Sequence, residues 1–121
     1  MTLNDYQEKA MTTCLPTSEN FSYMMLNLVG EVGEFASKVG KHIRKGNVCI
    51  ENNKLILCGE EWCLSEEDVQ ELQKEAGDVL WQLSGLCSVM GWSLEDIAQQ
   101  NLDKLSSRKK RGVVDGSGDN R

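Results

Sequence analysis

The fold of this chain is decided by residues 20–45, which read NFSYMMLNLVGEVGEFASKVGKHIRK. The apolar side chains in this segment recur at alternating steps of four and three: Phe21, Met25, Leu28, Val32, Phe35, Val39 and Ile43. Such spacing places them along one stripe of a helix, so the segment predicts a long amphipathic α-helix. Gly46 is a natural stop at its C-terminal end.

A second long helix is predicted to begin at Ser65. The run Ser65-Glu66-Glu67-Asp68 is a variant capping box, with a carboxylate three residues after the cap. Its apolar stripe again advances in threes and fours: Val69, Leu72, Ala76, Val79, Leu83, Leu86 and Met90. Gly91 closes the helix.

Two shorter helices and one hairpin complete the prediction. The helices run from Thr2 to about Thr13 and from Ser93 to about Arg111. Between the long helices, two short β-prone runs flank Asn52-Asn53, a pair that tolerates the positive φ of a tight turn. The expected fold is all-α and four-helix bundle-like, with a domain over 1–112, a hairpin insertion at about 47–58 and a tail over 113–121.

Composition and charge argue against some classes of partner and location. The chain has 121 residues and a formal charge of −6, with 19 acidic against 13 basic side chains. An acidic surface repels a phosphate backbone, which argues against a duplex nucleic acid as partner. No signal-peptide pattern opens the chain and no run of about 18 apolar residues follows, so we expect a cytoplasmic protein with no membrane partner.

Five cysteines in a chain without export signals are expected to be reduced thiols, packed as small apolar residues. The alternative is a zinc site that combines Cys58 and Cys63 with Cys49 and His42. The Cys58–Cys63 spacing is loose, and no second cysteine pair follows it.

Four carboxylates form the candidate site. Glu31 and Glu34 are three residues apart on one long helix, and Glu75 and Asp78 repeat that spacing on the next. Residues so spaced are neighbours on a helix surface, and both pairs border the apolar stripe. Four acids facing one another repel unless a cation joins them, and hard oxygen ligands suit Mg²⁺ or Mn²⁺. The alternative is that these acids only solvate helix faces.

The last helix contributes cations. Asn101 lies within its apolar arc, and Lys104 and Arg108 fall on the same side, where an anion such as phosphate could meet them. The alternative is that the long side chains of Lys104 and Arg108 extend past the edge of the core, so that their charges reach solvent. The single histidine excludes di-iron bundles and Ser-His-Asp machinery, and a phosphate-binding P-loop motif is absent.

With these residues the sequence resembles the MazG-like nucleoside triphosphate pyrophosphohydrolases, an all-α superfamily whose signature is Glu-x-x-Glu followed by Glu-x-x-Asp. Here the signature reads Glu31-Val32-Gly33-Glu34 and Glu75-Ala76-Gly77-Asp78. The likeness runs from about Leu3 to the end. It includes Gly91-Trp92-Ser93-Leu94-Glu95, Asn101-x-x-Lys104-Leu105-x-x-Arg108 and the tail Gly116-Ser117-Gly118-Asp119-Asn120-Arg121.

The resemblance implies Mg²⁺, or Mn²⁺, on Glu31, Glu34, Glu75 and Asp78, with Asn101, Lys104 and Arg108 on the nucleoside triphosphate. It further implies a homo-oligomer, a dimer or tetramer, with sites near subunit interfaces. Glu34, with Glu31 beside it, is the expected catalytic carboxylate that orients the attacking water. The linker that carries the hairpin is longer than in compact members, so base selectivity does not carry over. Enzymes selective for dUTP, dCTP or phosphoribosyl-ATP, and a non-catalytic dimerisation or regulatory module, remain the alternatives.

Overall fold

The computed structural model describes residues 1–121 and is mostly helical. Its elements are α1 (Leu3–Met11), a short 3-10 turn at Pro16–Ser18, α2 (Phe21–Arg44), β1 (Cys49–Glu51), β2 (Lys54–Ile56), α3 (Glu66–Val89) and α4 (Leu94–Arg111). The predicted all-α class, with a small hairpin between the second and third helices, is confirmed.

Each helix begins at a polar cap. The side-chain oxygens of Thr2, Asn20, Ser65 and Ser93 each accept a hydrogen bond from the backbone N–H three residues on, which satisfies a donor that the helix itself leaves free. At α1 the cap is reciprocal, because Asp5 also accepts from the Thr2 N–H at 3.0 Å. The cap predicted at Ser65 is confirmed, and the four caps fix where the helices start.

The hairpin pairs β1 and β2 in antiparallel register, with Ile50 opposite Leu55. Asn52 and Asn53 form its turn at φ of 51° and 62°, the left-handed region that asparagine tolerates. At the base of the hairpin, Val48 and Leu64 are buried with Leu72 of α3, which anchors this otherwise exposed element on the helices.

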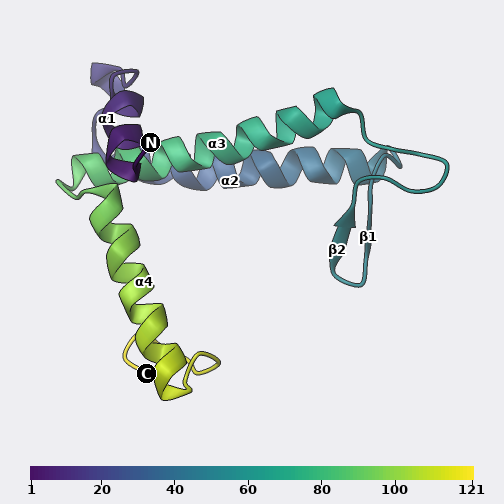
Figure 1. The fold of residues 1–121 in the computed structure, drawn as a ribbon. Helices are drawn as coiled ribbons and strands as arrows, with labels where there is room; N and C mark the ends of the chain where they lie inside the picture. The colour runs from purple at the N-terminus through teal and green to yellow at the C-terminus, as the bar shows by residue number, and fades with distance from the viewer.

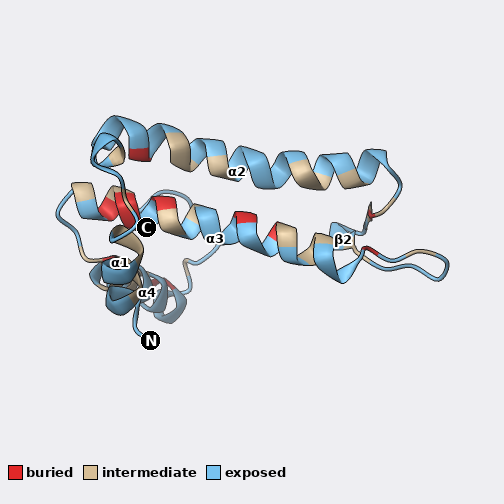
Figure 2. Cartoon of the chain, turned by 90° about the horizontal axis from the view of Figure 1, so that it is seen from above, coloured by how far each residue is buried: buried red, intermediate tan, exposed pale blue.

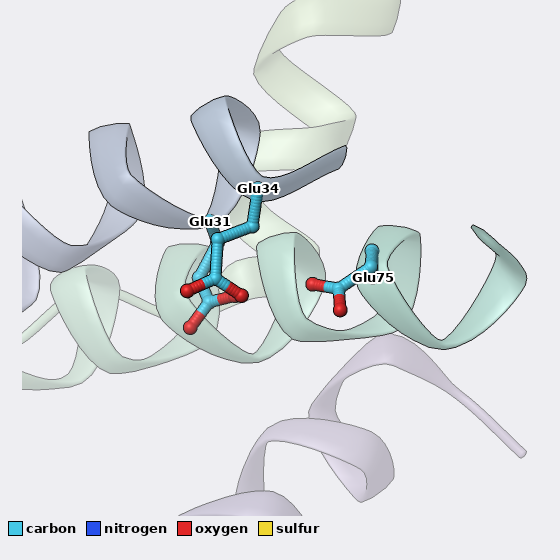
Figure 3. A group of neighbouring side chains, drawn as sticks. All are labelled: Glu31, Glu34 and Glu75. Carbon is cyan, nitrogen blue, oxygen red and sulfur yellow. The ribbon is translucent and has the colours of Figure 1, made fainter. Parts of the chain in front are cut away.

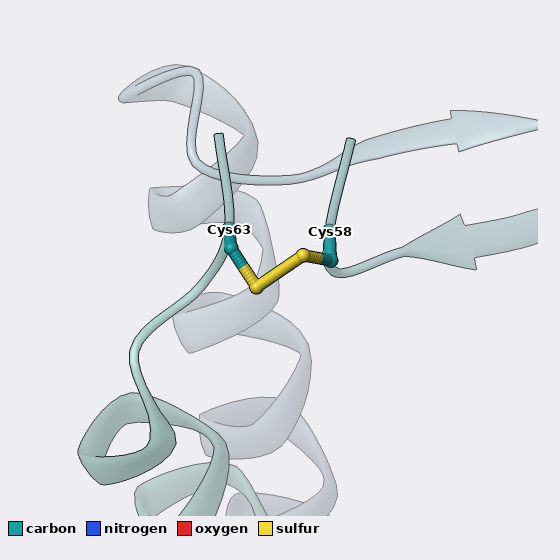
Figure 4. The surroundings of a disulfide bond; sticks show 2 residues. All are labelled: Cys58 and Cys63. Atoms are coloured by element: carbon teal, nitrogen blue, oxygen red, sulfur yellow. A yellow bond between two sulfur atoms is a disulfide. The ribbon is translucent and has the colours of Figure 1, made fainter. Parts of the chain in front are cut away.

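Cys58 and Cys63 form a disulfide just beyond β2 (Figure 4). The expectation of five reduced cysteines is wrong for this pair, since Cys14, Cys49 and Cys87 alone are free. The loop folds back on itself: the Gly59 N–H donates to the Trp62 carbonyl and the Leu64 N–H to the Leu57 carbonyl, each at 2.7 Å. This turn brings the two cysteines together, and the bond removes their thiolates from any zinc site.

The long helices α2 and α3 lie side by side and run in opposite directions (Figure 1). Helices α1 and α4 sit at the end away from the hairpin, and α4 leads away from the pair instead of packing along it. The Trp81 Nε1–H donates to the Ala10 carbonyl at 3.2 Å, and the side-chain amide oxygen of Gln7 accepts from the Leu94 N–H at 2.8 Å. These bonds hold α1 against the α3–α4 junction. Each helix falls short of the length or the apolar content that crossing a bilayer requires.

Buried residues gather on α3, whereas α2 is exposed along most of its length (Figure 2). Met24 is fully buried, yet the predicted stripe members Phe21 and Val32 are 55% and 53% exposed. Cys87 of α3 is buried, which agrees with the expectation that cysteines pack as small apolar residues. One copy of the chain therefore leaves much of the α2 stripe in contact with water.

A tight contact between α2 and α3 generates a stability prediction. A Cβ at Gly85 would collide with the thioether of Met24, whereas a Cβ at Gly77, on the same helix, would meet nothing within 4 Å. We expect Gly85→Ala to lower the free energy of unfolding by about 1–3 kcal/mol, because overpacking forces side chains off their rotamers. The matched variant Gly77→Ala should be neutral or stabilising by about 0.4–1 kcal/mol. Urea unfolding of both variants measures the difference, and equal destabilisation would contradict this packing.

Candidate metal and phosphate site

Three carboxylates meet where α2 packs on α3. One oxygen from each of Glu31, Glu34 and Glu75 lies within 4.8 Å of the others (Figure 3). Glu31 and Glu34 share a face of α2 because they are one helical step apart, and Glu75 faces them from α3. The packing of two helices thus concentrates three negative charges.

Burial makes this arrangement costly without a cation. Glu75 is only 6% exposed, and Glu31 is half-buried. Glu31 Oε2 and Glu75 Oε2 are both inaccessible and have no hydrogen-bond partner. An unpartnered buried carboxylate oxygen is destabilising, and three clustered carboxylates are ligands that suit a hard divalent cation. The residues therefore fit Mg²⁺ or Mn²⁺.

The raised pKa of Glu31 also indicates that negative charge is concentrated at this site. Burial raises the pKa of Glu31, and the charges of Asp78, Glu34 and Glu75 raise it further. Asn27 acts in the other direction, because its amide donates to Glu31 Oε1 at 3.4 Å and lowers the pKa. The ionised form of Glu31 is therefore disfavoured among its acidic neighbours.

Asp78 lies outside the set of three carboxylates, on an exposed part of α3. Its charge nevertheless raises the pKa of Glu31 and that of Tyr6 on α1. For both groups burial is the larger cause of the raised pKa. Its position as a fourth ligand remains a prediction. The aspartate side chain is short and lies further round the helix than Glu75, toward α1.

Lys38 is the residue that sequence reasoning missed. Its ammonium forms an ion pair with Glu75 and lies 3.9 Å from Glu71 Oε2. The hydrogen bond to Glu75 raises the pKa of Lys38, which keeps it charged. A signal was present, because Lys38 follows Glu31 by seven residues and Glu34 by four on the same helix face.

The predicted phosphate-binding cations do not reach the acids of their own chain. Lys104 and Arg108 lie toward the far end of α4, which leads away from the α2–α3 pair (Figure 1). Both instead bind Asp119 of the tail, at 3.2 Å and 3.1 Å. Arg108 is buried and also donates to the Asp119 carbonyl at 3.1 Å. Asn101 is exposed and lines an open cavity on α4 with Lys104.

The chain is similar to known proteins over most of its length. Residues 19–113 match the model of the MazG nucleotide pyrophosphohydrolase domain. The Gene 37 protein of Mycobacterium phage L5 is 41% identical over 103 residues, which cover 85% of this chain and 78% of the phage protein. No solved structure matches.

The pKa of Glu31 yields a pH-dependent prediction. A carboxyl group whose pKa is raised by folding stabilises the protein below its unfolded pKa of about 4.3 and loses that contribution as the pH rises through the folded pKa. In EDTA, Glu31→Gln should therefore melt a few degrees above the wild type at pH 7, and the gap should close near pH 4. Mg²⁺ should raise the melting temperature of the wild type more than that of the variant.

The control for this melt is Glu8→Gln, which neutralises an exposed helical glutamate remote from the cluster. Matched ionic strength separates Mg²⁺ binding from screening. The structure makes Glu31 a better test than Glu75, whose replacement would also break the ion pair with Lys38. Equal shifts by Mg²⁺ in the wild type and in Glu31→Gln would remove Glu31 from the ligand set.

Proposed function

Because this chain belongs to the MazG nucleotide pyrophosphohydrolase family, we propose that it hydrolyses nucleoside triphosphates, ribo or deoxy, to monophosphates and pyrophosphate with Mg²⁺. The observation that carries the proposal is the cluster of Glu31, Glu34 and Glu75, two of whose oxygens are buried without a partner. Family members typically use a divalent metal.

In this proposal Glu31, Glu34 and Glu75 hold Mg²⁺, with Asp78 as the fourth ligand. The ion supplies neutralisation of the phosphate charge and a lowered pKa for a bound water. Burial of Glu75 between the helices fixes the position of its free oxygen, so this side chain orients the site. Mn²⁺ suits the same oxygen ligands.

Glu34 is the proposed base. It is the exposed member of the cluster, and so it is open to solvent while Glu31 and Glu75 are partly enclosed. It accepts a proton from the water as the oxygen attacks phosphorus, and the bond between the α and β phosphates breaks to release pyrophosphate. Glu31, three residues before Glu34 on α2, assists it in orienting the water.

A second copy of the chain completes the site in this proposal. Leu26 and Val29 on α2 are 75% and 64% exposed, and Leu102 on α4 is 60% exposed. Association of two copies would cover such surfaces and bring Asn101, Lys104 and Arg108 of one copy to the acids of the other, as a homodimer or within a tetramer. Those cations then stabilise the leaving pyrophosphate.

The role that follows is housekeeping of the cytoplasmic nucleotide pool. The alternative is a narrower specificity for dUTP, dCTP or phosphoribosyl-ATP, because the hairpin near Asn52 extends the region between the two acidic motifs. A non-catalytic dimerisation or regulatory module is the other alternative. Buried carboxylate oxygens without partners argue against it, because in such a module they would destabilise the fold and serve no binding role.

The activity is tested with the purified chain, Mg²⁺ and a panel of nucleotides, assaying pyrophosphate and orthophosphate separately. We expect pyrophosphate, and expect Glu34→Gln and Asp78→Asn each to lower turnover by about 100-fold or more with an unchanged helical circular dichroism spectrum. Glu8→Gln is the control that keeps normal turnover. Orthophosphate alone would indicate a different phosphatase, and full turnover in both variants would dismiss the metal assignment.

Sharing of sites between copies predicts complementation. Glu34→Gln and Lys104→Ala should each be inactive or weak alone, and Lys104→Ala should lose affinity for triphosphates more than for monophosphates. After mixing and reassociation, about a quarter of the wild-type sites should be intact, because half the dimers are mixed and each mixed dimer keeps one complete site. Light scattering should report a dimer or tetramer. No recovery from a confirmed mixed oligomer would show that the site lies within one chain.

A further inference from the structure

One face of α2 changes sign along its length. Glu31 and Glu34 lie at its middle, and the same face continues toward the C-terminus with Lys38, Lys41 and Lys45, at steps of three and four residues. The acidic cluster therefore borders a row of cations on one helix.

These cations line an open cavity of about 230 Å³ between α2 and α3. His42 and Asn47 complete the wall on the side of α2, and Asp68 and Glu71 face them from α3. The volume is well above the roughly 10–15 Å³ that one water requires, so the cavity can admit larger polar groups.

Lys38 joins the cavity to the carboxylate cluster. It lines the cavity and also forms the ion pair with Glu75. An ammonium group has three N–H donors, and Glu75 occupies one of them, which leaves donors for a second acceptor. A group bound in the cavity through Lys38 would thus lie directly beside the carboxylates.

The charge balance of the cavity favours an anion. Lys41 and Lys45 form no ion pair, so their charges are uncommitted. Of the two acids in the wall, Glu71 is already engaged, because Lys74 contacts its Oε1 at 2.8 Å. Asp68 forms no ion pair, so of the two acids in the wall it opposes binding of an anion more strongly.

We propose that Lys38, Lys41 and Lys45 bind the phosphate chain of the nucleotide whose hydrolysis is assigned to the adjacent carboxylates. The inference rests on the proposed function and gives the site cations from its own chain. Lys104 and Arg108 of the same chain do not reach these acids, since they lie on α4, which leads away from the α2–α3 pair (Figure 1). The ligand class is a diphosphate or triphosphate, and free pyrophosphate shares its chemistry.

Calorimetric titration with inorganic pyrophosphate, and separately with a non-hydrolysable α,β-methylene nucleoside triphosphate in Mg²⁺, tests this inference. Lys41→Ala and Lys45→Ala should each raise Kd for both ligands by roughly fivefold, and less for a nucleoside monophosphate. Lys9→Ala is the matched control, a lysine in the last turn of α1 that loses the same charge far from the cavity. Asp68→Asn should act in the opposite direction and lower Kd by roughly twofold.

The outcomes separate this inference from the proposed function. Pyrophosphate release from triphosphates, with Kd unchanged in both lysine variants, would overturn the subsite and leave the activity intact. Pyrophosphate binding that weakens in those variants, without turnover of any triphosphate, would support the anion subsite and refute the activity. A loss in Lys9→Ala equal to that in Lys41→Ala would show only a general charge effect and would also overturn the subsite.

Discussion

The packing of α2 against α3 forces like charges together, and the rest of the molecule depends on it. Close approach at Met24 and Gly85 fixes the two helices side by side, so that Glu75 faces Glu31. Carboxylates at such distances repel, and burial strengthens the repulsion because the local dielectric is low. The chain partly offsets this with Lys38, and the two unpartnered oxygens are the part that a divalent cation would satisfy.

The proposed function depends on two features that one copy of the chain leaves incomplete: the cover of the α2 stripe and the cations near the carboxylates. One copy buries Met24 and the base of the hairpin, but much of the α2 stripe stays exposed and α4 leads away from the carboxylates. In a four-helix bundle that is stable as a monomer, the fourth helix would pack on that stripe. The course of α4 away from the pair both exposes the stripe and separates Lys104 from Glu31. A shared site and an oligomer are therefore proposed from the same position of α4.

Most of the fold could be predicted from local rules. The cap at Ser65, the glycine stops and the Asn52-Asn53 turn depend on a few neighbouring residues, and the sequence shows them directly. The position of α4 could not be predicted, because an amphipathic stripe does not say whether its partner is the same chain or another copy. Nor could the Cys58–Cys63 bond, which depends on how the loop folds back. Lys38 was missed because its role depends on a contact across helices.

The most direct test of the carboxylate cluster is where a paramagnetic ion binds. Amide resonances of the chain, followed during titration with substoichiometric Mn²⁺, should broaden around residues 30–35 of α2 and 72–79 of α3, since broadening falls steeply with distance from the ion. Excess Mg²⁺ should reverse the effect. Broadening centred on Glu66, Glu67 and Asp68 at the start of α3, or spread evenly over the acidic surface, would contradict the account, because the three packed carboxylates would then hold no ion.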